Sequence, residues 1–101
     1  MYCSGQAAVE SATAKLAAGG IGEQTSQTFN NLEAVLKDAG LSMDDVIKVN
    51  VYLTSMSNFA GMNAVYQARF NAPYPARTTV AVAELPLGAL VEIELVAQKG
   101  S

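Results

Sequence analysis

The fold of this chain is decided by the stretch VIKVNVYL, residues 46–53. From Ile47 to Leu53 every second residue is apolar, and the residues between them are Lys48, Asn50 and Tyr52. Successive side chains of a strand point to opposite faces of its sheet. The stretch therefore predicts a central strand with one covered face and one half-polar face.

Helical periodicity lies on both sides of this strand. From about Glu23 to Ala39, residues of the buried type recur at spacings of three and four, and Gly40 follows where a left-handed glycine commonly closes a helix. A second helix is predicted from about Asn58 to Phe70, with Ser57 as its cap and prolines beyond its end.

The remaining elements are strands and connections. A short strand is expected at Met1–Ser4, followed by a loop of small residues at Ala7–Gly22. Two further strands are predicted at Thr78–Leu85 and Leu90–Gln98, and the four residues 86–89 between them favour a β-hairpin.

The order β-α-β-α-β-β predicts an α+β fold in one domain, residues 1–101. Right-handed crossovers place both helices on one face of a single sheet. The last strand then presents Glu92 and Glu94 on the uncovered face, beside Lys48, Asn50 and Tyr52. Such a face is either solvated or covered by another subunit.

Composition excludes several classes of protein. The 101 residues are 50% hydrophobic with a net charge of −3, which argues against a protein that binds nucleic-acid phosphates. The chain has no histidine, and Cys3 is its only cysteine, so we expect neither an internal disulfide nor a cysteine-based zinc site. We also expect no other metal and no cofactor. No signal peptide or membrane span is recognisable, and we expect a cytoplasmic protein.

Arg77 and the two glutamates are the candidates for chemistry. Only 15% of residues are charged, so ions within strands call for an explanation. Arg77 can grip a carboxylate with two parallel bonds, and a nearby glutamate can hold or activate a water. Structural roles are the alternatives: an ion pair for Arg77, a structural partner for Glu92 or Glu94, and a helix-to-loop tie for Asn63.

Several collinear motifs resemble the YjgF family, also called Rid for reactive intermediate deaminase. They span nearly the whole chain, and the most specific is the series Pro-Ala-Arg, Leu-Pro and Val-Glu-Ile-Glu. The matching segments are residues 3–6, 24–25, 31–32, 39–41, 45–46, 62–63, 66, 75–77, 85–86 and 91–94.

The resemblance implies a chorismate-mutase-like fold, a homotrimer with pockets between subunits, and hydrolysis of reactive enamines and imines. Substrates of that kind are 2-aminoacrylate and 2-iminobutyrate, and the products are 2-keto acids and ammonia. In similar proteins the arginine matching Arg77 binds the substrate carboxylate, and the glutamate matching Glu92 positions or activates water. Further positions that match pocket-lining residues are Ser4, Gly5, Asn63 and Thr79.

Two departures from the family pattern alter the expected pocket. Thr79 stands where many relatives carry cysteine. Similar proteins also have a further strand before the Ser-Gly-Gln segment, which supplies a pocket tyrosine; the present sequence begins after that position. We therefore expect a pocket without that thiol and that phenol.

The predicted hairpin limits how the site can be assembled. With a turn at residues 86–89, Ala83 faces Glu92, and Arg77 lies six residues further along, roughly 20 Å away at about 3.3 Å per residue. One small ligand cannot touch both side chains in one chain. We therefore expect a joint site to draw them from two chains.

Other functions remain open at this point. The fold can serve a hydrolase with a different small substrate, or a non-catalytic binder of small carboxylate metabolites that uses Arg77 without turnover. An endoribonuclease or translation inhibitor is a third possibility. The acidic balance and the lack of histidine and of a basic cluster count against it.

Overall fold

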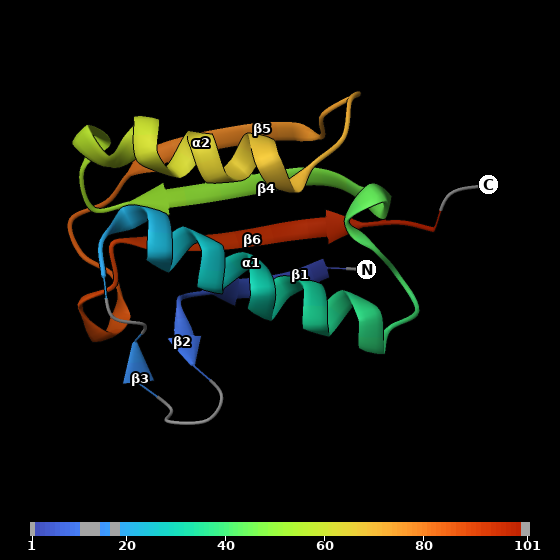
Figure 1. Cartoon of the computed structure of the whole chain (residues 1–101), viewed down its shortest axis with the longest axis horizontal. Coiled ribbons are helices and arrows are strands. Elements are labelled where there is room, and N and C mark those ends of the chain that lie inside the picture. Colours follow the sequence, from blue (N-terminus) through green and yellow to red (C-terminus); the bar gives the residue numbers. More distant parts are fainter. Residues whose placement is uncertain (1, 11–14, 17–18, 100–101) are drawn as a thin grey trace.

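The computed structural model describes residues 2–10, 15–16 and 19–99 (Figure 1). Two α-helices, six strands and three short 3-10 turns make up this part of the chain. In order they are β1 (Tyr2–Gln6), β2 (Val9–Glu10), β3 (Lys15–Leu16), α1 (Ile21–Asp38), η1 (Met43–Asp45), β4 (Val46–Leu53), η2 (Met56–Asn58), α2 (Phe59–Arg69), β5 (Ala76–Ala81), η3 (Pro86–Gly88) and β6 (Val91–Ala97).

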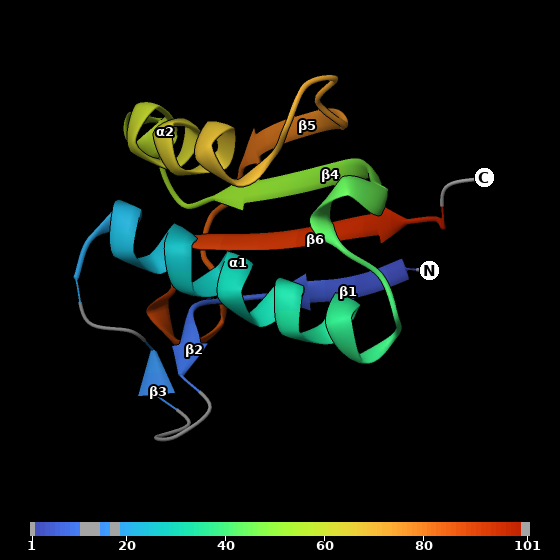
Figure 2. The same ribbon diagram turned by 45° about the vertical axis from the view of Figure 1, so that its right-hand side comes forward.

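Two layers form the fold, as predicted. Four strands build one mixed sheet in the order β1-β6-β4-β5, and β2 pairs with β3 in a small separate ribbon. Both helices lie over the same face of the large sheet in both views (Figures 1 and 2). The α+β architecture with two helices on one face is therefore confirmed.

The predicted hairpin of the last two strands is wrong. β5 pairs with β4 in parallel, whereas β6 lies between β4 and β1 and is antiparallel to both. The pattern of β6 explains this: Val91, Ile93, Leu95 and Ala97 are all buried, which suits a strand with neighbours on both sides. β5 begins after a proline and leaves most of its residues exposed, which suits an edge strand.

A bulge corrects the predicted apolar face of β4. Its register shifts between Val46 and Lys48, so Val46 is buried opposite Ala97 and Ile47 remains 50% exposed. An extra residue in one strand reverses the faces beyond it. From Val49 onward the predicted alternation is confirmed.

Several predicted boundaries differ from the structure. β1 continues to Gln6 rather than ending at Ser4, and Met1 lies outside the described residues. The predicted loop contains β2 and β3, while its residues 11–14 and 17–18 are outside the described part. The predicted Ser57 cap of α2 is wrong, because Asn58 precedes α2 and makes no side-chain cap hydrogen bond. Ser55 instead caps the start of η2, where its hydroxyl accepts a hydrogen bond from the Ser57 amide.

The core fills the space between the helices and the sheet. The helical periodicity of α1 predicts a buried stripe of Thr25, Thr28, Phe29, Leu32, Val35 and Leu36. All of these are buried except Val35, which is partly buried against the core. The two helices approach closely at Gly61, where an added Cβ would lie 2.6 Å from the Ile21 side chain. Across the described residues, none of the helices combines the length and apolar character needed to cross a membrane.

Candidate functional site

Arg77 points toward α2 and not toward the open face of the sheet. Its position in β5 is opposite Val49 in β4, which is fully buried under the helices. Paired residues of neighbouring strands share a face. The guanidinium therefore lies on the helix-covered face, at the sheet edge formed by β5.

The guanidinium of Arg77 has an amide and two rings for neighbours. Its Nη1 donates to Asn63 Oδ1 at 2.5 Å. Its central carbon lies 4.5 Å from the ring centroid of Tyr66 and 5.3 Å from that of Phe59. Within the described residues no carboxylate forms an ion pair with Arg77. The predicted alternative of a structural ion pair is therefore absent from this part of the chain.

A pocket of about 330 Å³ adjoins this arginine. Its lining comprises Asn63, Tyr66, Gln67, Tyr74, Pro75 and Arg77. Two buried hydroxyls on the same face, those of Tyr66 and Thr79, have no hydrogen-bond partner among the described residues. A positive charge without a counter-ion in this pocket favours a small anionic ligand.

Glu92 lies on the opposite, open face of the sheet. It is paired with Tyr52 of β4, is partly buried, and forms no hydrogen bond within the described residues. Gly5 of β1 leaves room for it, because a Cβ built at Gly5 would lie 2.6 Å from Glu92 Oε2. The absence of a side chain at Gly5 thus permits the position of the glutamate carboxylate.

Glu94, two residues further on the same face, is held by three donors. The hydroxyls of Tyr2 and Tyr52 donate to it at 2.5 Å each, and Asn50 donates at 3.0 Å. Hydrogen bonds from Tyr2, Tyr52 and Asn50 hold the pKa of Glu94 below its usual range. The hydrogen bond to Glu94 in turn raises the pKa of Tyr52 to about 12. Glu94 is therefore the glutamate with structural partners.

The predicted site residues form two groups within one chain. Arg77, Asn63 and Thr79 lie on the helix-covered face, whereas Glu92 and Gly5 meet on the open face. Ser4 belongs to β1, and its side chain lies outside the described part of the structure.

The separation derived from the hairpin needs correction. Arg77 is level with Val49 and Glu92 with Tyr52, on strands that flank β4. They are about 10 Å apart along the strands and about 10 Å across them, and their side chains leave opposite faces. This corrected geometry gives the same conclusion, that one small ligand cannot contact both side chains within one chain.

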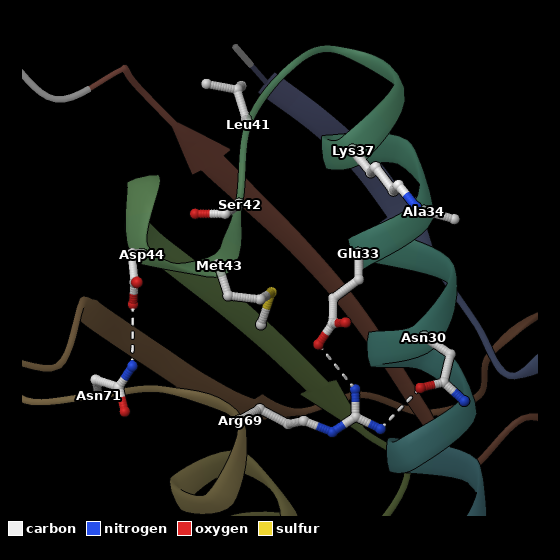
Figure 3. A pocket seen from close by; sticks show the side chains of 10 residues that line it. All are labelled: Asn30, Glu33, Ala34, Lys37, Leu41, Ser42, Met43, Asp44, Arg69 and Asn71. Atoms are coloured by element: carbon white, nitrogen blue, oxygen red, sulfur yellow. Dashed lines mark hydrogen bonds and ion pairs between the residues drawn. The ribbon is translucent and has the colours of Figure 1, made fainter.

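A different hollow, of about 570 Å³, lies between α1 and the segment that follows it (Figure 3). Arg69 lines it and reaches toward Glu33 and Asn30 of α1, which bind its guanidinium at 3.1 and 2.9 Å. Because this arginine is already neutralised, the hollow is a weaker candidate for an anion. The described residues contain no cluster suited to a metal ion.

Two features of the site escape sequence reasoning. The helical spacing of Tyr66 predicts a core residue, yet its ring also supports Arg77. The pattern of the strands does not connect Tyr2 and Tyr52 with Glu94. The contact between Tyr52 and Glu94 could have been anticipated, since the sequence predicts both residues on the open face. No local signal connects Tyr66 with Arg77.

Comparison with known proteins identifies the family. The profile described as Endoribonuclease L-PSP matches residues 1–99. A 2-iminobutanoate/2-iminopropanoate deaminase of Dermatophagoides farinae is 42% identical over 94 residues, which cover 93% of this chain and 73% of that protein. A putative endoribonuclease of Thermotoga maritima has a TM-score of 0.96 at 42% identity, covering 100% of this chain and 80% of that one. RidA of the Antarctic bacterium Psychrobacter sp. PAMC 21119 has a TM-score of 0.91 at 45% identity, covering 95% and 77%. The chain belongs to the endoribonuclease L-PSP family, to which the names YjgF and Rid also apply.

Proposed function

We propose that this protein hydrolyses small 2-imino acids, and the enamines that give rise to them, to 2-keto acids and ammonia. The observation that carries the proposal is Arg77, whose guanidinium lies in a pocket with one amide contact and no carboxylate partner among the described residues. Relatives named as 2-iminobutanoate/2-iminopropanoate deaminases, 42% and 38% identical to this chain, support the substrate class.

Arg77 anchors the substrate through its carboxylate. A charge-assisted, two-pronged contact of this kind contributes about 1.5–3 kcal/mol. It selects acids over neutral imines and fixes the position of the imine carbon one bond away. Positioning accounts for much of the required rate, because a free imine already reacts with water.

Glu92 prepares the water. Its carboxylate accepts a proton from a water molecule as the oxygen attacks the imine carbon. The resulting tetrahedral intermediate carries a hydroxyl and an amine on one carbon. Starting from the protonated imine, Glu92 returns this proton to the amine and the C–N bond breaks. The hydroxyl proton passes to the departing ammonia as the C=O bond of the 2-keto acid forms, so Glu92 ends in its initial state.

The site requires two chains. Within one chain Arg77 and Glu92 leave opposite faces of the sheet, so a neighbouring chain must supply one of them. We propose a homotrimer in which each interface joins Arg77 of one subunit to Glu92 of the next. A heterologous interface of this kind closes into a ring of three when it relates neighbouring subunits by a third of a turn.

Mixing two inactive variants tests this arrangement. Arg77→Ala and Glu92→Gln are each expected to hydrolyse enzymatically generated 2-iminobutyrate at the spontaneous rate, measured as ammonia release. After joint unfolding and refolding in equal amounts, about a quarter of the interfaces should combine an intact Arg77 with an intact Glu92 and regain activity. Each variant refolded alone is the control, and light scattering measures the mass of the assembly.

The outcome separates the possible functions. No recovery in mixed trimers contradicts a shared site, and a monomer in solution contradicts the assembly. Wild-type protein that binds 2-oxobutyrate without accelerating hydrolysis is a non-catalytic binder of small carboxylates. RNA cleavage that survives Arg77→Ala and repeated purification would support the ribonuclease named in the family description.

A further inference from the structure

Three residues of α2 contact Arg77 from a single face of the helix. Phe59, Asn63 and Tyr66 follow at spacings of four and three, which align side chains along one stripe. Each has a contact with the guanidinium. We call these three residues the Arg77 cradle.

The cradle restrains the arginine and leaves most of its donors free. Aromatic rings attract a cation through their faces and accept no conventional N–H bond in doing so. Tyr66 at 4.5 Å and Phe59 at 5.3 Å therefore hold the group without using its donors. Asn63 takes one bond at Nη1, and a guanidinium has five N–H groups.

A restrained, unneutralised guanidinium suits a planar carboxylate. Two parallel bonds form only if the plane of the guanidinium matches the plane of the acid. Carboxylate partners would fix the orientation equally well, but they would cancel the charge. Rings and an amide fix it while the charge is retained.

We infer that Phe59, Asn63 and Tyr66 are positioning residues that set the plane of Arg77 for a carboxylate ligand, with the ring of Tyr66 as the main support. This inference rests on the proposed function, because it takes the ligand of Arg77 to be a small acid. It assigns Tyr66 a role beyond the core, in which it is 96% buried against Phe29 and Phe70.

The hydroxyl of Tyr66 allows the ring to be tested by itself. It is buried and has no partner among the described residues, so its removal leaves no donor or acceptor unpaired in this part of the chain. Tyr66→Phe should therefore keep both stability and ligand affinity. Tyr66→Leu removes the ring and should weaken the affinity for 2-oxobutyrate roughly tenfold.

Phe29→Leu is the matched control for damage to the core. Phe29 belongs to the same aromatic cluster, at 6.1 Å from Tyr66 and 5.7 Å from Phe70, but its ring lies under Arg69 at 5.8 Å. Its loss should lower stability much as Tyr66→Leu does. The affinity for 2-oxobutyrate should stay near the wild-type value.

Two measurements on the assembled protein complete the test. Titration calorimetry gives the 2-oxobutyrate affinity, and NMR gives the chemical shift of the Arg77 Nε–H proton, assigned with Arg77→Lys. The ring at position 66 should shift this resonance away from that of an exposed arginine in the wild type and in Tyr66→Phe. Loss of the ring in Tyr66→Leu should bring the resonance back toward the value of an exposed arginine. If Tyr66→Leu does not fold, Phe59→Leu takes its place with a smaller expected effect.

The results distinguish this inference from the proposed function. The positioning role of the cradle is contradicted if Tyr66→Leu binds 2-oxobutyrate with wild-type affinity. It is also contradicted if Tyr66→Phe and Tyr66→Leu lose equal affinity. A wild-type protein that binds 2-oxobutyrate without hydrolysing imines contradicts the proposed activity. The 2-oxobutyrate affinities of the Tyr66 variants still test the positioning role of the cradle in that case. A wild-type protein that binds no small acid overturns both.

Discussion

Arg69 and Arg77 hold their charges in opposite ways although both lie beside one aromatic cluster. Arg69 lies over Phe29 and donates to the backbone and hydroxyl oxygens of Ser26, to Asn30 and to Glu33. Arg77 lies over Tyr66, and Asn63 is its one hydrogen-bond acceptor in the described chain. The first arginine joins two helices, and the second remains available to an outside anion.

The same contrast separates Glu94 from Glu92. Glu94 accepts hydrogen bonds from Tyr2, Asn50 and Tyr52, so its charge is stabilised within the chain. Glu92 accepts none within the described residues and borders Gly5. One arginine and one glutamate thus serve the fold, and the other two are free to act on a ligand.

The largest effect is expected from the two arginines. Arg77→Ala should reduce 2-iminobutyrate hydrolysis to the spontaneous rate with little change in thermal unfolding. Arg69→Ala should retain turnover and lower the free energy of unfolding by roughly 1–3 kcal/mol, because it breaks the contacts between α1 and α2. Ammonia release and thermal melts of both variants provide the measurements.

The difference between the two arginines would be contradicted if Arg77 proved dispensable for turnover or if Arg69 proved essential for it. Full turnover in Arg77→Ala excludes this arginine as the anchor. Loss of turnover in a well-folded Arg69→Ala variant would make the hollow lined by Arg69 the better candidate for the ligand site. Arg69→Lys should be more stable than Arg69→Ala because it keeps the positive charge. It should remain less stable than the wild type because lysine cannot make the several hydrogen bonds of the guanidinium.

The glutamates should differ next most strongly. Glu92→Gln removes the proton acceptor and should lower turnover by roughly 10²–10⁴-fold while 2-oxobutyrate still binds. Glu94→Gln keeps a side chain of similar shape and should mainly lower stability. Single-turnover rates and calorimetry distinguish the two effects. Equal rates for Glu92→Gln and the wild type would exclude Glu92 from the mechanism.

Gly5 should show a smaller effect that acts through Glu92. Gly5→Ala places a Cβ within 2.6 Å of Glu92 Oε2, so the carboxylate must move. We expect turnover to fall roughly tenfold or more, since small displacements of a reacting group are costly. The affinity for 2-oxobutyrate, measured by calorimetry, should change little because Arg77, the proposed anchor of the ligand carboxylate, is unchanged in this variant.

Gly22→Ala is the control for adding a methyl group. Gly22 lies in α1, where an added Cβ would have no described atom beyond the nearby helix backbone within 4 Å, and alanine favours helix over glycine. This variant should keep full turnover and gain a little stability. Equal turnover in the Gly5 and Gly22 variants would show that the Glu92 carboxylate tolerates displacement.

Sequence patterns predict the faces of strands better than their partners. Alternation places Glu92, Glu94 and Tyr52 on the open face, because side-chain direction in a strand depends only on position along it. Strand pairing depends on the whole sheet, and the short spacing before β6 favours a hairpin that β6 does not form. Periodicity also marks Tyr66 as buried, but a spacing rule contains no information about its contact with Arg77.

The smallest expected effect concerns Tyr52 and Glu94 at alkaline pH. Unfolded Tyr52 loses its proton near an ordinary pKa of about 10, whereas the hydrogen bond to Glu94 raises the pKa of folded Tyr52 to about 12. The folded state then binds more protons, so the free energy of unfolding falls as pH rises from about 10 to 12. Below that window this contribution is fully present.

Tyr52→Phe should remove that part of the pH dependence. Its free energy of unfolding, measured by denaturant titration at pH 8 and pH 11, should fall less than that of the wild type. Tyr74→Phe is the control, because Tyr74 is 54% exposed and makes no hydrogen bond within the described residues. At acidic pH the sign reverses: Glu94 has a lowered pKa, so its contribution is lost only as pH falls through that lowered value. Identical slopes for Tyr52→Phe and the wild type would mean that the pair does not persist in the assembled protein.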